Sequence, residues 1–345
     1  MQRKLFLAWL VFLITLTSSG CGKRVTDHEQ IDPAEKIVIK FSHVVAENAP
    51  KGLAARRFAN LVAARTNGRV EVQVYPNSTL YKDGEEIEAL KNGSVQIIAP
   101  TTAKIAALFP RWQIFDIPYV FTSAEMVYRA MDGKIGGELF DELATQGFRG
   151  LAFWGNGFKQ MTNGIRPLRE PGDFKGLTMR VMMGSQILPT QFQCLGAQPV
   201  QLGFNDLYAA LAQKIIDGQE NTMSNIYSKK FYEVQPYLTL SNHGYMGYVV
   251  LTNRKFWDHL PPDIRGILEK AMQEVTVWER EQASLLDEES FRAIRSTGQI
   301  RLHLQTEEEK RQWLTAFTPL YRQAEEIVGS DLWRAVQVLK EKKEP

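Results

Sequence analysis

The sequence predicts an α/β protein with two lobes, each built on a mostly parallel sheet flanked by helices. The chain has 345 residues, a length that favours two domains over one. Strand and helix patterns alternate between residues 37 and 100, and the alternation resumes near residue 150 after a break. Alternation of this kind is typical of a parallel sheet with helices on both faces. We therefore expect two α/β halves, more than one chain crossing between them, and a ligand in the cleft.

The first half opens with a strand at residues 37–41, followed by a helix over residues 51–64 whose apolar residues recur on one face. Residues 69–75 ("RVEVQVY") alternate as a half-buried strand does. Residues 84–93 ("GEEIEALKNG") predict a helix that ends at a glycine, and residues 95–100 ("VQIIAP") predict a buried strand. The predicted order of elements in the first half is therefore strand, helix, strand, helix, strand.

The second half repeats this rhythm. Its long helix opens at Pro261 and Pro262, because proline is favoured in the first turn, and it extends to about Ser296. A capping-box-like start predicts another helix from residues 306–313. Shorter helices are predicted at residues 185–196 and 205–214, and strands at residues 150–154, 177–182, 198–202, 237–243, 247–253 and 299–305.

The N-terminus has the layout of a secretory signal peptide. Arg3 and Lys4 precede an apolar run over residues 5–16, which is too short for a comfortable membrane span, and small residues follow. They end at Cys21, so "SSGC" resembles a lipobox, with Ser18 in place of the usual Leu. Lipid modification of Cys21 and ordinary cleavage both stay open. We expect an exported protein in the periplasm or on the outer face of the cell membrane.

Composition and motif searches exclude several classes of function. The net charge of +2, without a basic block interleaved with aromatics, gives no support for nucleic-acid binding. No apolar run of 18 residues follows the leader, so no membrane span is expected. The histidines have no metal-ligand spacing, and no nucleophile elbow or phosphate loop occurs. "WGNGFKQ" has Gln160 where a dinucleotide fingerprint needs a third glycine. We predict no catalytic residue, metal or cofactor, and a buried thiol at Cys194.

Arg180 is the strongest binding candidate. It interrupts the apolar stretch "LTMRVM", which is predicted to be a buried strand, where arginine is rarely found. A guanidinium offers a planar fork of donors that suits a carboxylate. The alternative is a structural ion pair inside the second lobe.

Other polar residues stand near predicted strand ends, where ligands of open α/β sheets bind. Asn221 ends "DGQEN" and has an amide that can donate to an anion, although asparagine there is usually a turn residue. His43 directly follows the first strand. Lys104 and Lys159 are single cations whose ordinary interpretation is a solvated surface lysine, and Phe204 is ordinarily a core residue.

Seven segments carry a combination of motifs. These are "FSHVVAENAPKG", "YPNSTLYKDGEEIEALKNG", "FDIPYVF", "WGNGFKQMTN", "DFKGLTMRV", "IIDGQENTMSNIYSKKFYEVQPYLTLSNHGYMGY" and "FWDHLPPDIR". Together they resemble the extracytoplasmic solute-binding subunit of TRAP transporters, of the DctP type, from about Ile37 to beyond Gly298. The resemblance is strongest to the branch that binds four-carbon dicarboxylates such as malate, succinate and fumarate. It implies a two-lobed clamshell like that of periplasmic binding proteins.

The resemblance also implies roles for individual residues. Arg180 would fix a substrate carboxylate, and Asn221 and Lys159 would share it. Phe204 would form an apolar wall. His43 and Lys104 would read the second end of a dicarboxylate in the first lobe, and Asp83 would lie near the ligand. The expected partners are a small organic acid and the membrane permease subunits. No nucleic-acid partner is expected, and contact with the membrane is expected only through a lipid anchor.

Two departures leave the substrate open. Thr222 stands where the family usually has Pro, and Met182 and Met183 follow "MRV" where dicarboxylate binders tend to be more polar. A 2-oxo or hydroxy monocarboxylate is therefore an alternative ligand, and service to a sensor kinase is an alternative role. A secreted hydrolase or lyase would need a nucleophile and base, and the sequence has no such pattern.

The predicted domain boundaries follow from these assignments. Residues 1–21 form the signal peptide and residues 22–35 a polar tether. Residues 36–156 with 247–285 form the first lobe, and residues 157–246 with 286–345 form the second lobe.

Overall fold

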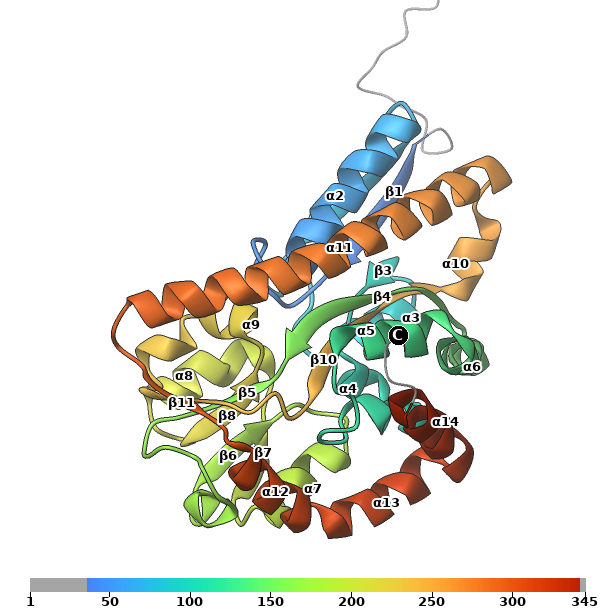
Figure 1. Ribbon diagram of the computed structural model, residues 1–345. Helices are drawn as coiled ribbons and strands as arrows, with labels where there is room; N and C mark the ends of the chain where they lie inside the picture. The colour runs from blue at the N-terminus through green and yellow to red at the C-terminus, as the bar shows by residue number, and fades with distance from the viewer. Residues whose placement is uncertain (1–35, 342–345) are drawn as a thin grey trace, which may run out of the picture. The chain divides into compact units, whose positions relative to one another are not determined.

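Two β-sheets surrounded by helices make up residues 36–341, the part of the chain that the computed structural model describes (Figure 1). From Val38 onward the chain is one compact unit, so both sheets belong to the same unit. The predicted signal peptide, the tether and Cys21 lie outside the described residues. No helix among residues 36–341 is long and apolar enough to cross a membrane.

The first sheet has five strands in the order β2-β1-β3-β10-β4. β1 runs parallel to β3, whereas β10 runs antiparallel to β3 and to β4. Phe41 of β1 stacks on Trp154 of β4, with ring centroids 5.9 Å apart, in the buried core. The strands are β1 (Ile37–Ser42), β2 (Val70–Tyr75), β3 (Ile97–Ile98), β4 (Phe148–Phe158) and β10 (Tyr245–Asn253).

The second sheet has six strands in the order β11-β9-β5-β8-β6-β7. β6 lies between two parallel neighbours, β8 and β7, and β11 is parallel to β9. β5 runs antiparallel to β8 and β9. The strands are β5 (Gln160–Asn163), β6 (Thr178–Val181), β7 (Gln198–Gln201), β8 (Gly218–Asn221), β9 (Tyr237–Leu240) and β11 (Arg301–Leu304).

Both sheets are mixed, whereas the sequence pattern predicts mostly parallel sheets. The reason is the way the chain crosses between them. It leaves the first sheet along β4 and enters the second as β5, and it leaves the second along β9 and returns as β10. An outgoing and a returning strand that pair must be antiparallel, as β4 and β10 and also β5 and β9 are. The expectation of repeated crossings is confirmed.

The predicted helices are present, with ends that differ by a few residues. The capping box at Thr306 and Glu309 and the proline start of α11 are confirmed. The sequence reading missed α4 (Thr102–Ile105), α5 (Ala124–Asp132), α6 (Lys134–Leu143), α9 (Met223–Ser228), α10 (Arg254–His259), α13 (Thr318–Val328) and α14 (Ser330–Glu341). The others are α2 (Pro50–Arg65), α3 (Glu86–Lys91), α7 (Ile187–Cys194), α8 (Leu207–Ala212), α11 (Pro262–Ser296) and α12 (Glu307–Ala316).

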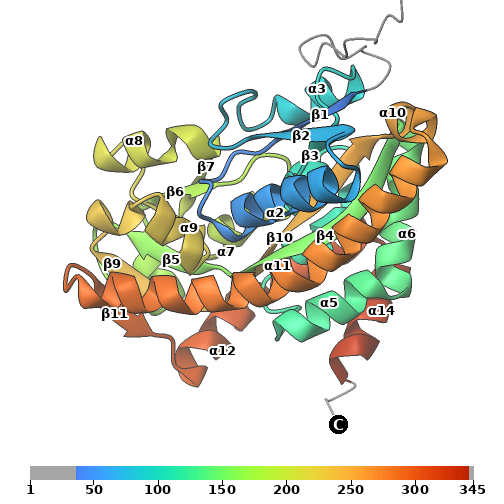
Figure 2. The same ribbon diagram turned by 90° about the horizontal axis from the view of Figure 1, so that it is seen from above.

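The long helix α11 runs along both sheets. It contacts α2 and β4 of the first sheet and α9 beside the second, and it lies next to α2 in both views (Figures 1 and 2). Its buried Glu279 accepts a hydrogen bond from the backbone N–H of Gly155 in β4 at 2.8 Å. The helix therefore spans the region where the chain crosses between the sheets.

Cys194 is half-buried, and the expectation of a buried thiol is wrong. It is the last residue of α7. Partial burial raises the pKa of its thiol.

Candidate ligand-binding site

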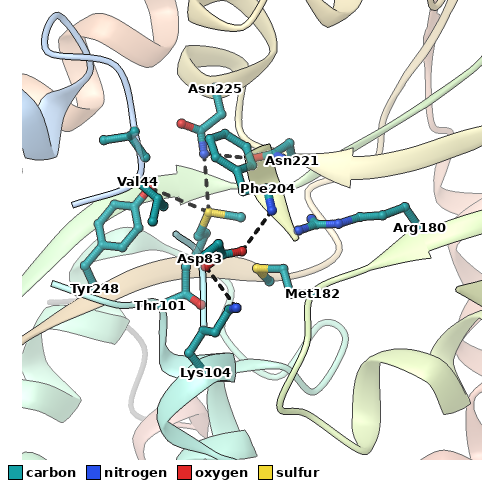
Figure 3. Close-up of a pocket in the computed structure, with 12 residues that line it drawn as sticks. Val44, Asp83, Thr101, Lys104, Arg180, Met182, Phe204, Asn221, Asn225 and Tyr248 are labelled. Atoms are coloured by element: carbon teal, nitrogen blue, oxygen red, sulfur yellow. Dashed lines mark hydrogen bonds and ion pairs between the residues drawn. The ribbon is translucent and has the colours of Figure 1, made fainter. Parts of the chain in front are cut away.

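A pocket lies between elements of the two sheets (Figure 3). The first sheet contributes the segment after β1, the loop before α3, helix α4 and strand β10. The second contributes β6, β8, the turn after β7, and α9. The lining residues are Val44, Val45, Asp83, Thr101, Lys104, Arg180, Met182, Phe204, Asn221, Asn225, Met246 and Tyr248.

Arg180 lies in β6, in the interior of the second sheet, and its side chain is 1% exposed. Its Nε donates to the carbonyl oxygen of Leu202 at 2.9 Å, and its Nη1 has no hydrogen-bond partner. No carboxylate among the described residues forms an ion pair with it. Burial lowers its pKa to about 10, an effect that Asp83 and Glu220 oppose, so the group stays cationic at neutral pH. An unfilled buried guanidinium N–H facing a pocket suits an anion.

Asn221 ends β8 and faces the same pocket. Its Oδ1 accepts from Asn225 Nδ2 at 2.8 Å and from the backbone N–H of Thr222 at 3.2 Å. Its Nδ2 donates to Gln219 Oε1 at 3.1 Å. Because an amide nitrogen has two hydrogens, one remains available to a ligand. The site therefore presents donors at this end.

Asp83 and Lys104 form an ion pair at 2.9 Å on the opposite side of the pocket, and both side chains are almost fully buried. The second carboxylate oxygen of Asp83 accepts from the backbone N–H of Phe204 at 2.9 Å (Figure 3). Asp83 thus joins a residue beside the first sheet to a residue beside the second. The ring of Phe204 packs edge-on against Phe231 and lines the pocket.

Lys159 is not among the residues that line this pocket. It lies between β4 and β5, fully buried, and its ammonium is 2.5 Å from Glu220 of β8. His243, between β9 and β10, contacts the other oxygen of Glu220 at 2.7 Å. Burial would raise the pKa of Glu220, but Lys159 and His243 hold it far below its usual range. Lys159 therefore neutralises an internal carboxylate.

His43 also does not line the pocket, although the next two residues, Val44 and Val45, do. Its side chain is fully buried. Burial, with a smaller contribution from the charge of Lys51, lowers its pKa to about 3, so the imidazole is neutral at physiological pH. The structure therefore brings together five of the seven residues proposed from the sequence: Arg180, Asn221, Phe204, Lys104 and Asp83.

Several pocket residues were not singled out as binding candidates. Asn225 lies in the first turn of α9, directly after β8, and its side-chain amide donates to the Oδ1 of Asn221. Tyr248 lines the pocket and covers the buried ammonium of Lys51, which lies 3.8 Å from its ring centroid. Thr101, Val44, Val45 and Met246 carry no sequence signal that separates them from core or loop residues.

At Gly184 the segment after β6 closely approaches helix α4 near the pocket. Gly184 follows Met182 and Met183, and it has φ +102°. A Cβ added there would lie 2.4 Å from the carbonyl oxygen of Ala103 in α4. Only a glycine fits without a shift of the backbone.

Within residues 36–341 no cluster of three or more His, Cys, Asp or Glu residues is placed to hold a metal ion. The buried carboxylate of Asp116 has an oxygen without a hydrogen-bond partner, and burial raises its pKa to about 7. It does not line the pocket. The described charged groups in the pocket are therefore Arg180, Lys104 and Asp83.

Comparison with known proteins supplies the context for this pocket. The pattern of bacterial extracellular solute-binding protein, family 7, matches residues 41–327. A C4-dicarboxylate-binding protein, DctB, of Bacillus subtilis is 46% identical over 322 residues, which cover 93% of this chain and 92% of the relative.

Solved structures agree with that match. A TRAP periplasmic solute-binding protein from Sulfurospirillum deleyianum with bound succinate has a TM-score of 0.85 and 42% identity, covering 88% of this chain and 99% of that one. A sugar-acid-binding protein from Advenella mimigardefordensis, in complex with galactonate, has a TM-score of 0.86 and 31% identity, covering 89% and 99%.

Proposed function

The chain belongs to bacterial extracellular solute-binding protein family 7, and we propose that it captures a four-carbon dicarboxylate and delivers it to the membrane subunits of a TRAP transporter. The single observation that carries the proposal is Arg180, a buried cation with an unfilled N–H in a pocket between two sheets. A carboxylate matches its planar fork of donors. The names of the relatives, one C4-dicarboxylate-binding and one solved with succinate, support the choice of ligand.

The proposed mechanism is closure of two lobes around the ligand. Arg180 and Asn221 hold one carboxylate from the second sheet, while Lys104 meets the other from the first sheet. A ligand that contacts both sides shifts the open and closed populations toward the closed state. The lobes would follow the two sheets, and the boundaries predicted from the sequence stay a prediction. Helices α13 and α14 contact the segment around Pro118 and Tyr119, which belongs to the predicted first lobe.

We also propose binding without turnover. Members of the family are solute-binding proteins, and the pocket offers an ion pair, an amide and an arginine rather than a nucleophile beside a base. Succinate, malate and fumarate should be recovered unchanged after long incubation. Conversion that scales with protein concentration would overturn this part of the proposal.

A monocarboxylate remains the second candidate, because Met182 lines the pocket and adds apolar surface. The relative solved with galactonate shows that this fold holds a sugar acid. Thermal melting of the purified chain against succinate, malate, fumarate, galactonate and 2-oxo acids decides between the two. A ligand at a hundred times its dissociation constant should add about 2.7 kcal/mol of stability. Stabilisation by monocarboxylates alone would reject the dicarboxylate assignment.

Export and anchoring are testable on the same expressed protein. We propose that the chain is cut before Cys21 and is held at the membrane by a lipid on that cysteine. The mature form should then begin at Cys21 and partition with membranes. A soluble product that begins downstream of Cys21 would contradict the anchor and leave export intact.

A further inference from the structure

Asp83 places a fixed negative charge inside the pocket. Its side chain is 10% exposed, and both of its carboxylate oxygens are engaged, one by the ammonium of Lys104 at 2.9 Å and one by the N–H of Phe204 at 2.9 Å. Its own backbone N–H points to Asn205 Oδ1 at 3.4 Å. These partners come from both sides of the pocket (Figure 3). The carboxylate is therefore part of the wall and not a mobile side chain.

The charges that line the pocket do not match a dicarboxylate one to one. Arg180 and Lys104 carry two positive charges, and Asp83 carries one negative charge. Arg180 has an unfilled N–H for the first carboxylate of a ligand. Lys104 is already paired, so a second carboxylate would share the ammonium with Asp83 at close range. Like charges at such a distance repel in a partly desolvated site.

We infer that Asp83 is a specificity-determining residue, because its carboxylate competes with the second carboxylate of the ligand for Lys104. The inference rests on the proposed function. In the protein as it stands, Asp83 keeps the buried ammonium of Lys104 paired when no ligand is present. It also lowers the preference for a dianion over a monoanion of the same length. Specificity of this kind is a difference between two affinities that one charge can shift.

The test is the substitution Asp83→Asn. The amide oxygen can still accept from the N–H of Phe204, while the negative charge on Lys104 is removed. Dissociation constants for succinate and butyrate, which have the same chain length, are measured by calorimetry, with butyrate measured by competition against succinate. The preference for succinate over butyrate, given by the ratio of the two dissociation constants, should increase about tenfold, a change of about 1.4 kcal/mol.

Glu85→Gln is the matched control. Glu85 lies two residues away and accepts from the backbone N–H of Lys82 at 2.8 Å, and it does not line the pocket. The control removes one negative charge by the same chemical change, from carboxylate to amide. If the ratio of the succinate and butyrate dissociation constants changes equally in both variants, the effect is general electrostatics and the inference is overturned. A ratio that is unchanged, or that moves toward butyrate, in Asp83→Asn would overturn it as well.

A second background shows that the effect acts through Lys104. With Lys104→Met already in place, Asp83→Asn should move the ratio clearly less than tenfold, because the competition for the ammonium is gone and only the direct repulsion between the two carboxylates remains. A full tenfold shift in that background would contradict the inference. Failure of the unmodified chain to bind any dicarboxylate is a separate result, since it rejects the proposed function before any variant is compared.

Discussion

At the scale of single residues, the site depends on Arg180. Its Nε donates a hydrogen bond to the carbonyl oxygen of Leu202, while its Nη1 has no hydrogen-bond partner. We predict that Arg180→Ala weakens dicarboxylate binding roughly a hundredfold or more, because a charge-assisted contact contributes about 1.5–3 kcal/mol and a buried charge left alone costs about 3–5. Arg180→Lys should restore only part of the affinity, since an ammonium lacks the planar fork. Calorimetric titration measures both variants.

The same substitution separates a ligand anchor from a structural ion pair. No described carboxylate pairs with Arg180, so the Arg180→Ala protein should melt at the wild-type temperature or above it. Near-normal affinity together with a strongly lowered melting temperature would show that the guanidinium serves the fold instead.

Lys104 is the residue that meets the second end of the ligand in the proposed complex. We predict that Lys104→Ala weakens succinate more than butyrate, because only succinate has a second charge, although Asp83 already takes part of the ammonium. The measurement is the pair of dissociation constants. An equal loss for both ligands would assign Lys104 to structure or general electrostatics.

At the scale of elements, strand β8 contacts the first two chain crossings through Glu220, which pairs with Lys159 of the first crossing and His243 of the second. We predict that Glu220→Gln or Lys159→Met alone lowers the free energy of unfolding by about 3–5 kcal/mol, because each leaves a buried charge uncompensated. The double variant should cost clearly less than the sum. Urea unfolding of all four proteins measures the coupling, and additive costs would contradict a buried pair.

The 3-10 helix at Pro110–Phe115 ends at Asp116, which gives the fold a pH dependence. Burial raises the pKa of Asp116 from 3.8 to about 7, while Lys159 opposes the shift. The pKa of Asp116 is higher in the folded protein than in the unfolded chain. The contribution of this carboxyl group to the free energy of unfolding is therefore fully favourable in acid and is lost as the pH rises toward 7. Asp116→Asn should therefore gain roughly 3 kcal/mol relative to the wild type between pH 5 and pH 8. Parallel stability curves for the two proteins would contradict the assignment.

Some elements with a clear local signal were predicted well from the sequence. The alternating strand at residues 70–75 and the proline-opened α11 needed no tertiary information. The four-residue β5 and six-residue α9 were missed because so few residues carry no period. Shortness does not explain α13, an 11-residue helix that was missed although its buried residues Leu320, Ala324 and Val328 recur at helical spacing. The antiparallel direction of β10 could not be inferred either, because it depends on which strands of the first sheet become its neighbours.

The binding residues divide in the same way. Arg180 stood out because a charged residue in a buried strand needs a local reason. Lys159 had the ordinary interpretation of a solvated surface lysine. Its partner, Glu220, lies on the other face of β8 from Asn221, and only the pairing of β5 with β8 brings Lys159 and Glu220 together. Asn225 and Tyr248 depend on how α9 and β10 approach the pocket, which no short stretch of sequence encodes.

At the scale of the whole molecule, closure of the pocket requires elements of the two sheets to meet, and Gly184 lies against Ala103 where they do. We predict that Gly184→Ala lowers ligand affinity more than tenfold, because the added methyl holds the two sides apart and the closed state becomes less populated. Calorimetry gives the affinity, and small-angle scattering should show a smaller ligand-induced contraction than in the wild type.

The control for that variant is Gly176→Ala. Gly176 also has a positive φ, +78°, but a Cβ there meets nothing within 4 Å. It carries the backbone strain without the contact between the sheets. Wild-type affinity in Gly184→Ala, or an equal loss of affinity in both variants, would show that the approach at Ala103 does not limit closure.

The position of β10 has a consequence for how the protein is made. β10 lies between β3 and β4 in the first sheet, so β4 has no strand partner and β3 has only β1 until residues 245–253 have been synthesised. A nascent chain that folds from its N-terminus therefore cannot complete this sheet, and its stable assembly waits for pairings between distant residues. The first sheet therefore stays incomplete for most of the chain's synthesis. A translocation channel accepts a chain that has not completed its fold, and we expect the late strand to extend the time during which the chain can be exported.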